Sequence, residues 1–504
     1  MQSLSKYSGV VSGAATILAA IAVALSVSGC AETPGDSVTP EVPRPKVVMS
    51  PCADAGPRSE LRCGRLPVPE EYARPELRRI DLNIVVAPAR NRAEEPLAVF
   101  VLEGGPGAPA TAGADFFLEE GAAYREQHDV VMVDLRGTGA SNPLYCAPLE
   151  RHGVPLQRHL DEMYPPSEVT ECRSSLESRA DLRQYVTSNA VEDLEMVRRA
   201  LEYAKVDLHA TSYGTRLATE YIRRYPEQVR TLTAIGSLPP EHRMPLHHAA
   251  GFQRAFDLLL SDCEAQVACR QAFPDLRNRW NLLLGRLAQP LAYHYESADL
   301  EDGISLTIRR DVFVEKLRSA MYFATGARSL PRVVDAASRD DFAPFLELAL
   351  PADPDLPPFI AAGAYLSFTC TDDVSRIAAG DVFSFTGDTW LGDYRVAQQM
   401  RACKLWPSGS YPVALVSPVE SSVPALLITG DRDPVTPPSD ARRMAQGLSN
   451  ARVVIVPHAG HMPFDLSDPE CIDRIMLAFL QSATVEDLDL TCIDALEPPP
   501  FVLN

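Results

Sequence analysis

The stretch VDLHATSYGTRLATEYIRRY at residues 206–225 joins a short apolar run to a helical pattern through a serine. Its first five residues predict a strand and the part after Ser212 a helix, with Ser212 on the sharp turn between them. Ala210 and Gly214 flank this serine, and small residues at these two positions allow such a turn to close against its neighbours. The usual pattern has glycine at both positions, so Ala210 is a mild departure. This segment predicts a nucleophilic serine between a strand and a helix.

Apolar runs on both sides of this segment have the length of buried strands. They cover residues 80–86, 97–102, 129–133, 230–235, 423–428 and 453–456. Continuous apolar runs are typical of strands that are buried on both faces of a parallel sheet. Helical patterns separate many of these runs, and this alternation predicts an α/β fold with a mostly parallel, doubly wound sheet.

The alternation stops in the middle of the chain. Helical patterns such as 249–263 and 311–322 dominate there, strand signals are few, and the alternation resumes at 423. A mainly helical insertion into one interrupted core explains this resumption better than a separate second domain. The expected organisation is a core in two parts, residues 51–240 and 413–504, with a mainly helical cap at residues 241–412.

A catalytic serine needs a base within hydrogen-bonding reach and an acid that orients the base. In this arrangement the acid and the histidine follow the serine in chain order. Asp431 and Asp433 follow the first C-terminal apolar run, and His458 and His461 follow the second. The carboxyl ends of neighbouring parallel strands converge on one crevice, so one residue of each pair can meet Ser212. The residues alone do not decide between the two aspartates or between the two histidines.

Five motifs occur in a fixed order along the chain. They are EGGPG at 103–107, DLRGTGAS at 134–141, TSYG at 211–214, DPVTP at 433–437 and GH at 460–461. In this order they resemble the prolyl and tripeptidyl aminopeptidase group of α/β-hydrolases, in its secreted or lipoprotein branch with a TAP-like C-terminal region. The resemblance begins near residue 63, reaches the C-terminus and is weakest in the middle. It implies an α/β-hydrolase fold whose cap restricts access to the site.

The resemblance also implies the roles of individual residues. The site residues it implies are the catalytic Ser212, Asp433 and His461 and the oxyanion-hole positions Gly104, Gly105 and Tyr213. Glycines let the backbone approach a substrate closely, and two N–H groups aimed at a developing oxyanion stabilise it. Asp134 and Arg136, in the second motif, are expected to brace the neighbouring loops rather than to react.

The implied activity is that of a serine aminopeptidase, which releases short residues or peptides from free peptide N-termini through an acyl-enzyme. A substrate ammonium group needs an acidic partner. Glu103, Asp372 and Asp373 are candidates for this partner, and the sequence does not choose among them. Glu103 stands where many members of the group carry histidine. For this residue the favoured alternative to pairing with an ammonium is that it caps its own loop.

Two other functions remain open. A carboxylesterase would use the same three catalytic residues, and a non-catalytic binding lipoprotein would keep the fold without the chemistry. We expect a peptide substrate and no cofactor. We also expect no metal, because the chain has no C-x-x-C motif and no Cys/His cluster at ligand spacing. The net charge of −20 without a basic cluster argues against nucleic-acid binding.

The N-terminus is predicted to be a targeting segment. Residues 1–29 combine Lys6 with an apolar run at 10–25 and small residues before Cys30, as a secretory signal does. They resemble a bacterial lipobox, which implies cleavage before Cys30 and a lipid on its sulfur; an uncleaved membrane anchor is the alternative. Residues 30–50 predict an extended tether. The expected location is the cell envelope, with the lipid anchor in the outer membrane if the host has two membranes, or outside the cell.

The cysteine count supports export. Setting aside Cys30 leaves ten of the eleven cysteines, an even number, and these lie close together in pairs. An oxidising compartment favours disulfides between such cysteines. The predicted bridges are Cys52–Cys63, Cys146–Cys172, Cys263–Cys269, Cys370–Cys403 and Cys471–Cys492.

Overall fold

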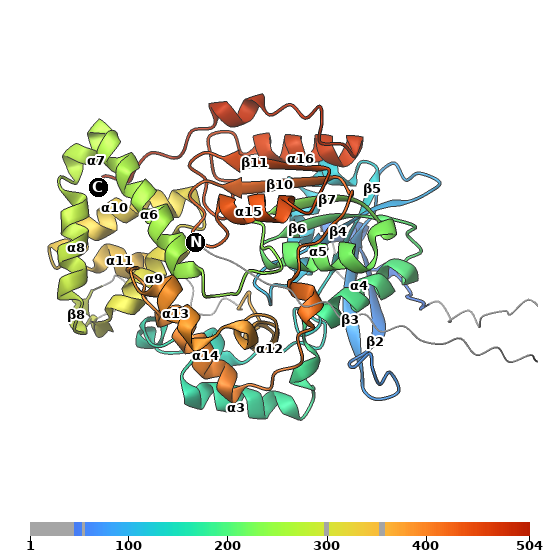
Figure 1. The fold of residues 1–504 in the computed structure, drawn as a ribbon, viewed down its shortest axis with the longest axis horizontal. Helices are drawn as coiled ribbons and strands as arrows, with labels where there is room; N and C mark the ends of the chain where they lie inside the picture. Colours follow the sequence, from blue (N-terminus) through green and yellow to red (C-terminus); the bar gives the residue numbers. More distant parts are fainter. Residues whose placement is uncertain (1–44, 53–55, 297–301, 352–357) are drawn as a thin grey trace, which may run out of the picture. The chain divides into compact units, whose positions relative to one another are not determined.

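A nine-stranded sheet forms the centre of the computed structural model (Figure 1). The described residues are 45–52, 56–296, 302–351 and 358–504, so the predicted signal segment, Cys30 and most of the tether lie outside them. In spatial order the strands are β1 (Ser50–Pro51), β2 (Arg62–Pro69), β3 (Arg79–Ala87), β5 (His128–Val133), β4 (Leu97–Leu102), β6 (Val206–Thr211), β7 (Val229–Ile235), β10 (Ala425–Gly430) and β11 (Ala451–Val456).

The strands from β5 to β11 run parallel, and β1, β2 and β3 form an antiparallel edge. The predicted class, α/β with a mostly parallel sheet, is confirmed. Strand β4 lies between β5 and β6, so the chain leaves β4 toward one side of the sheet and returns on the other. A crevice opens at the carboxyl ends of the strands where the order reverses in this way. The loops that follow β4 and β6 meet at this point.

Alternate residues of the central strands belong to two apolar layers. On β4, Phe100 and Leu102 pack in the layer that contains α4 (Thr187–Ala200), α5 (Tyr213–Arg224) and α15 (Pro438–Ala445). Val99 and Val101 pack in the opposite layer, with α1 (Ala114–Leu118) and α16 (Glu470–Ser482). Both faces of the sheet are covered, which is why the central strands are continuous apolar runs in the sequence.

The chain between β7 and β10 is mainly helical; we call it the cap, and part of it has an apolar core of its own. Its helices are α6 (His248–Ala265), α7 (Val267–Ala272), α8 (Leu276–Arg286), α9 (Arg310–Ala320), α10 (Ala324–Ser338), α11 (Ala343–Ala349), α12 (Ala362–Asp372), α13 (Ala379–Thr386) and α14 (Tyr394–Leu405). The cap also contains an antiparallel hairpin of β8 (Leu291–Tyr295) and β9 (Ile304–Ile308), which the sequence did not reveal.

A second excursion of the chain joins the cap. The segment between β5 and α4 carries α2 (Ala147–Glu150) and α3 (Pro166–Glu177), and α3 packs against α12 and α14 rather than on the sheet (Figure 1). The Gln398 side chain of α14 accepts the Met163 N–H of this segment at 2.6 Å. Part of the expected core region, residues 51–240, therefore packs against helices of the cap.

The C-terminal tail also reaches the cap and ends beside α10 (Figure 1). The Arg328 guanidinium lies 4.2 Å from the centre of the Phe501 ring, and the Val502 N–H donates to the Arg328 carbonyl at 3.2 Å. The last residues of the chain therefore connect the end of the core to the cap by non-covalent contacts.

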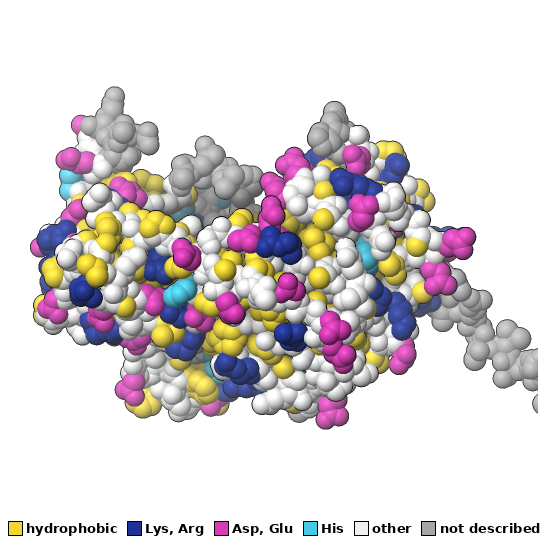
Figure 2. Space-filling model, turned by 90° about the horizontal axis from the view of Figure 1, so that it is seen from above, with side chains coloured by type: hydrophobic (Ala, Val, Ile, Leu, Met, Phe, Trp, Pro, Cys, Tyr) yellow, Lys and Arg dark blue, Asp and Glu magenta, His cyan; other side chains and the backbone are white. Residues whose placement is uncertain are grey.

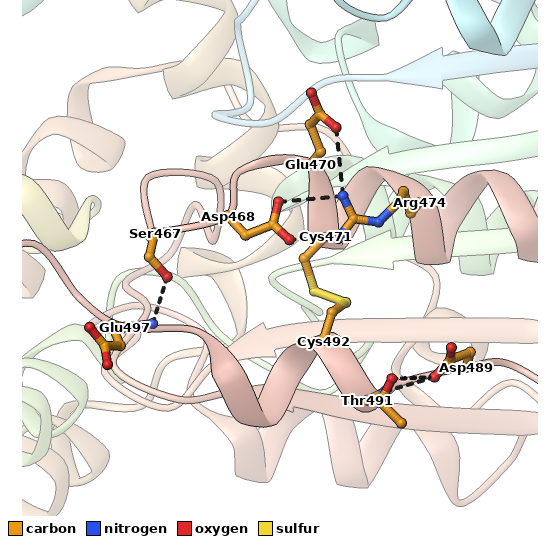
Figure 3. The surroundings of a disulfide bond; sticks show 9 residues. All are labelled: Ser467, Asp468, Glu470, Cys471, Arg474, Asp489, Thr491, Cys492 and Glu497. Atoms are coloured by element: carbon orange, nitrogen blue, oxygen red, sulfur yellow. Dashed lines mark hydrogen bonds and ion pairs between the residues drawn. A yellow bond between two sulfur atoms is a disulfide. The ribbon is translucent and has the colours of Figure 1, made fainter.

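The five predicted disulfides are confirmed, with partners 6 to 33 residues apart in the chain. Figure 3 shows the bridge between Cys471, in the first turn of α16, and Cys492, in the following short helix. Arg474 forms ion pairs with Glu470 in the same turn and with Asp468 just before the helix. The bridge fixes the C-terminal segment beside the start of α16.

Acidic and basic side chains are interspersed on the face of the molecule that Figure 2 shows, with apolar side chains between them. None of the helices in the described ranges combines the length and the hydropathy of a bilayer-spanning segment.

We expect alkylation of the unreduced, denatured protein to modify no cysteine other than Cys30, because the ten others form five bridges. Reduction before alkylation should add ten labels, which the intact mass reports. Two or more labels outside Cys30 without reduction would contradict the pairing.

Candidate active site

Ser212 lies in a strained turn between β6 and α5. Its backbone has φ 55° and ψ −120°, a region that costs a non-glycine residue about 1–3 kcal/mol. The Ser212 N–H donates to the Ile235 carbonyl at 2.8 Å, and the Ser212 carbonyl accepts the Thr215 N–H at 2.9 Å. Because such a turn raises the side chain above the carboxyl end of the sheet, it suits a reactive hydroxyl.

Close backbone packing brings the loop after β4 beside this turn. A Cβ atom at Gly214 would lie 2.0 Å from the Leu102 carbonyl oxygen, so only glycine lets α5 approach β4 this closely. A Cβ atom at Gly104 would lie 2.9 Å from the Ser212 Cβ and 3.4 Å from its Oγ. The backbone at Gly104 is therefore a close neighbour of the Ser212 hydroxyl.

Asp433 and His461 form a buried acid–base pair. His461 Nδ1 lies 2.7 Å from Asp433 Oδ2, and His461 and Asp433 are 2% and 0% exposed. Asp433 Oδ1 accepts the backbone N–H groups of Val435 and Thr436, and Oδ2 accepts the Thr436 hydroxyl. Burial alone raises the pKa of Asp433, but His461 and these donors outweigh it and hold the pKa below its ordinary value. Asp433 is therefore a carboxylate that orients the imidazole.

The other aspartate and the other histidine have different partners. Asp431 pairs with Arg432 at 2.6 Å, and His458 Nδ1 lies 3.6 Å from Asp262. The geometry thus selects the pair Asp433 and His461, which the residue pattern had left open.

Ser212 and His461 both contact the end of β7. The Ser212 N–H is bound to Ile235, and a Cβ atom at the next residue, Gly236, would lie only 2.7 Å from His461 Cε1. His461 Nε2 is buried and has no hydrogen-bond partner among the described residues, Ser212 Oγ included. This nitrogen is therefore available to a hydroxyl or a substrate.

The cap reaches the site through Tyr322. The Tyr322 ring packs edge-on against the His461 imidazole, with the ring centres 4.9 Å apart, and the Tyr322 carbonyl accepts the Met462 N–H at 2.9 Å. A Cβ atom at Gly460 would lie 2.4 Å from the Met321 carbonyl oxygen, so glycine permits this contact. The cap thus packs directly on the loop that carries the histidine.

Three residues of the site were not identified as such from the sequence: Gly236, Tyr322 and Thr436. Thr436 was visible only as part of the DPVTP motif, although its hydroxyl lies 2.8 Å from Asp433 Oδ2 and 3.1 Å from His461 Nδ1. Gly236 could have been suspected, because a glycine directly after a buried strand marks a close approach. Tyr322 carried no sequence signal.

The residues expected to form an oxyanion hole flank Ser212. Tyr213 is the first residue of α5, where a backbone N–H has no acceptor within the helix. Gly105 has φ 106°, a conformation that favours glycine, and a Cβ atom there would lie 3.1 Å from the Ile360 side chain of the cap. A substrate carbonyl above Ser212 would have backbone donors on both sides.

The three acids considered for the substrate ammonium differ in their surroundings. Asp372 accepts the N–H and the hydroxyl of Thr187, and burial raises its pKa to about 7. Asp373 binds the Arg216 guanidinium at 2.8 Å, and both aspartates are 1% exposed. Their protein partners thus favour a structural role.

Glu103 is the acid beside the predicted oxyanion loop. It is half-buried and has no ion-pair partner among the described residues. Burial raises its pKa, and a hydrogen bond from the Gly104 N–H opposes that shift. Of the three acids, Glu103 is the one left without a cationic partner or a side-chain donor from the described part of the chain.

Arg136 and Asp134 both brace loops of the fold. Arg136 is fully buried, binds the Asp193 carboxylate through two nitrogens at 2.7 Å each and donates to the Glu70 carbonyl. Asp134 accepts the Thr111 and Ala140 N–H groups, each at 3.0 Å. These contacts fit the structural roles expected for both residues.

Two known proteins with similar sequences carry names that fit the resemblance. The serine protease Hip1 of Mycobacterium tuberculosis is 26% identical over 269 residues, which cover 49% of this chain and 51% of Hip1. The chain therefore spans about half the length of that relative. The tripeptidyl aminopeptidase of Streptomyces lividans is 22% identical over 483 residues, which cover 87% of this chain and 85% of that enzyme. The predicted resemblance to this group is confirmed.

Among solved structures, a proline iminopeptidase of Mycobacterium smegmatis is 16% identical, covering 83% of this chain and 98% of its own, with a TM-score of 0.37. The model of the alpha/beta hydrolase fold family matches residues 98–468, a range that runs from β4 past His461. The chain therefore belongs to the alpha/beta hydrolase fold family.

Proposed function

We propose that the protein is a serine peptidase that removes short residues or peptides from free peptide N-termini. The observation that carries this proposal is the buried hydrogen bond between Asp433 and His461, which lies beside the strained turn of Ser212 and leaves His461 Nε2 without a partner among the described residues. The names of the relatives, serine protease and tripeptidyl aminopeptidase, support a peptide substrate.

In the proposed reaction, Ser212 Oγ attacks the scissile carbonyl carbon while His461 Nε2 takes the serine proton. The C–N bond then breaks, His461 gives this proton to the leaving amine, and an acyl-enzyme on Ser212 remains. Water attacks the acyl-enzyme with His461 again as the base, which releases the acid and restores the hydroxyl. Asp433 holds the Nδ1–H of His461 throughout and stabilises the imidazolium.

The oxyanion of each tetrahedral intermediate is proposed to accept the Tyr213 N–H and an N–H of the Gly104–Gly105 loop. Such donors are fixed before the reaction, so each stabilises the transition state by about 3–4 kcal/mol.

Glu103 is the proposed partner of the substrate ammonium group. It is half-buried beside the oxyanion loop, it lacks an ion pair among the described residues, and burial raises its pKa. A substrate ammonium beside Glu103 would favour the carboxylate form of Glu103. Binding of the substrate and deprotonation of Glu103 would therefore stabilise each other.

Export to an oxidising compartment is part of the proposal, and the five disulfides support it. We propose in addition that a lipid on Cys30 anchors the protein at the cell envelope.

The proposed nucleophile and substrate class can be tested together. A fluorophosphonate should label the wild-type protein and not Ser212→Ala, and this substitution should lower kcat by about 10⁶-fold. A panel of peptidyl and aminoacyl anilides, each with a free and a blocked N-terminus, should show turnover only with the free terminus. Hydrolysis of simple acyl esters alone would make the protein a carboxylesterase, and a folded protein that is not labelled would make it a binding protein.

Asp433→Asn should lower kcat about 10⁴-fold, because a neutral amide stabilises neither the required tautomer of His461 nor its imidazolium form. Asp431→Asn is the matched control two residues earlier, and it should keep most of the activity because Asp431 pairs with Arg432. Equal losses in the two variants would refute the assignment of Asp433.

Gly236→Ala should lower kcat by at least about 10²-fold, because the added methyl group would displace the imidazole of His461. Gly153→Ala controls for backbone strain, since both glycines have φ 64° and no atom lies within 4 Å of a Cβ at Gly153. The comparison is made at equal folded fraction, measured by circular dichroism. Similar activity of the two variants would show that this approach to His461 is unimportant.

A further inference from the structure

The cap contains a cluster of cations with a single carboxylate among them. Lys316, Arg318 and Glu315 lie on α9, Arg395 lies on α14, and Arg151 follows α2 in the second excursion. On the outer face shown in Figure 2, by contrast, charges of both signs are interspersed. We call these five residues the cationic cluster.

Glu315 is fully engaged by the two arginines of the cluster. It is 5% exposed and accepts Arg318 Nε at 3.0 Å and Arg318 Nη2 at 2.7 Å, while Arg395 Nε lies 3.7 Å away. The single carboxylate of the cluster thus binds one guanidinium group and lies near a second, while neither Lys316 nor Arg151 forms an ion pair with it among the described residues.

Lys316 and Arg151 have neutral partners only, within the described ranges of the chain. Lys316 Nζ donates to the Ala349 carbonyl at 2.7 Å, and Arg151 donates to the carbonyls of His159 and Asp161 at 3.3 and 3.2 Å. Carbonyl groups solvate a cation but do not neutralise it. Burial, followed by the nearby charge of Arg151, lowers the pKa of Lys316 to about 8, which reflects the unfavourable environment of this ammonium.

Both cations line one cavity of about 540 Å³ in the cap. Its lining also contains two acids: Glu315 is bound to Arg318, and Asp161 accepts the neutral Gln157 Nε2 at 2.9 Å. The four cations of the cluster outnumber these two carboxylates. The rest of the lining is partly apolar and includes Phe323.

The cavity borders the part of the cap that contacts the proposed catalytic histidine. Phe323 follows Tyr322 in the chain, and the Tyr322 ring packs against His461. Arg318 of the cationic cluster lies 5.6 Å from the centre of the same Tyr322 ring. A ligand in this cavity would contact Phe323, which is the next residue after Tyr322 in the chain; Tyr322 itself is not part of the lining.

We propose that this cavity binds a carboxylate group of a short peptide, with Lys316 and Arg151 as its cationic partners. The inference rests on the proposed peptidase function for the nature of the ligand and adds a preference for peptides that carry a carboxylate at this position. A carboxylate would supply the missing negative charge and accept charge-assisted hydrogen bonds, while the apolar lining would cover the adjacent hydrocarbon. The carboxylate comes either from an acidic side chain or from the C-terminus of a short substrate.

Binding to the full-length Ser212→Ala protein, measured by calorimetry, tests this without turnover. One pair of ligands is tetra-alanine and its C-terminal amide; the second pair is Ala-Ala-Glu-Ala amide and Ala-Ala-Gln-Ala amide. In at least one pair the member with the carboxylate should bind 10-fold or more tightly, and the pair that shows this identifies the source of the carboxylate. Lys316→Met should abolish the preference, and Lys316→Arg should keep most of it.

Lys205→Met, which removes an exposed lysine, is the matched control and should keep the preference in full. Thermal melting shows whether each variant is folded. If Lys316→Met does not fold, the binding preference of Lys316→Arg still tests the proposal. Equal binding within both pairs, no binding of any of the four peptides at millimolar concentration, or a preference that survives Lys316→Met would overturn the proposal. A wild-type protein that shows the preference but cleaves no peptide would instead overturn the peptidase function and leave the carboxylate site in place.

Discussion

The close approach of backbone segments at the carboxyl ends of the central strands is the constraint on which the site depends. Helix α5 can follow Ser212 only because Gly214 has no side chain. A Cβ atom at this position would lie 2.0 Å from the Leu102 carbonyl oxygen. The same contact places the β4 loop beside the serine, and the order reversal between β4 and β6 leaves a crevice there. The strain of the Ser212 turn persists because neighbouring strands hold both of its ends by hydrogen bonds and packing. A loosened turn would therefore disturb the nucleophile and its neighbouring donors together.

The sequence predicted those parts of the site that depend on local pattern. Ser212 could be assigned because a strand and a helix flank it within a few residues. Asp433 could not be separated from Asp431 by pattern alone, since both follow the same strand, and only the motif resemblance and then the contact with His461 distinguished them. Asp373 was considered as a partner for a substrate, but its partner is Arg216, which lies 157 residues earlier in the chain. Contacts over such separations leave no local signal.

The same limit applied to the fold. Buried strands were predictable because both faces of the sheet are covered, which requires continuous apolar runs. The hairpin of β8 and β9 was missed because its alternating, half-exposed residues give a weak pattern within a helical region. The segment between β5 and α4 has ordinary helical features, and nothing in them indicates that it packs on α12 and α14 rather than on the sheet. Periodicity reports which face of an element is buried but not which element buries it.

The pattern of disulfides has a consequence for motion. Every described bridge closes a short loop, and none links the segment from α6 to α14 to the rest of the chain. Oxidation therefore restrains each part internally and adds no covalent link between that segment and the rest of the described chain. Apart from the backbone, non-covalent contacts hold the two parts together, among them the buried ion pair of Asp373 with Arg216 and the packing of Tyr322 on the histidine loop. Reduction of the disulfides would therefore loosen each part from within without removing any cross-link between the two.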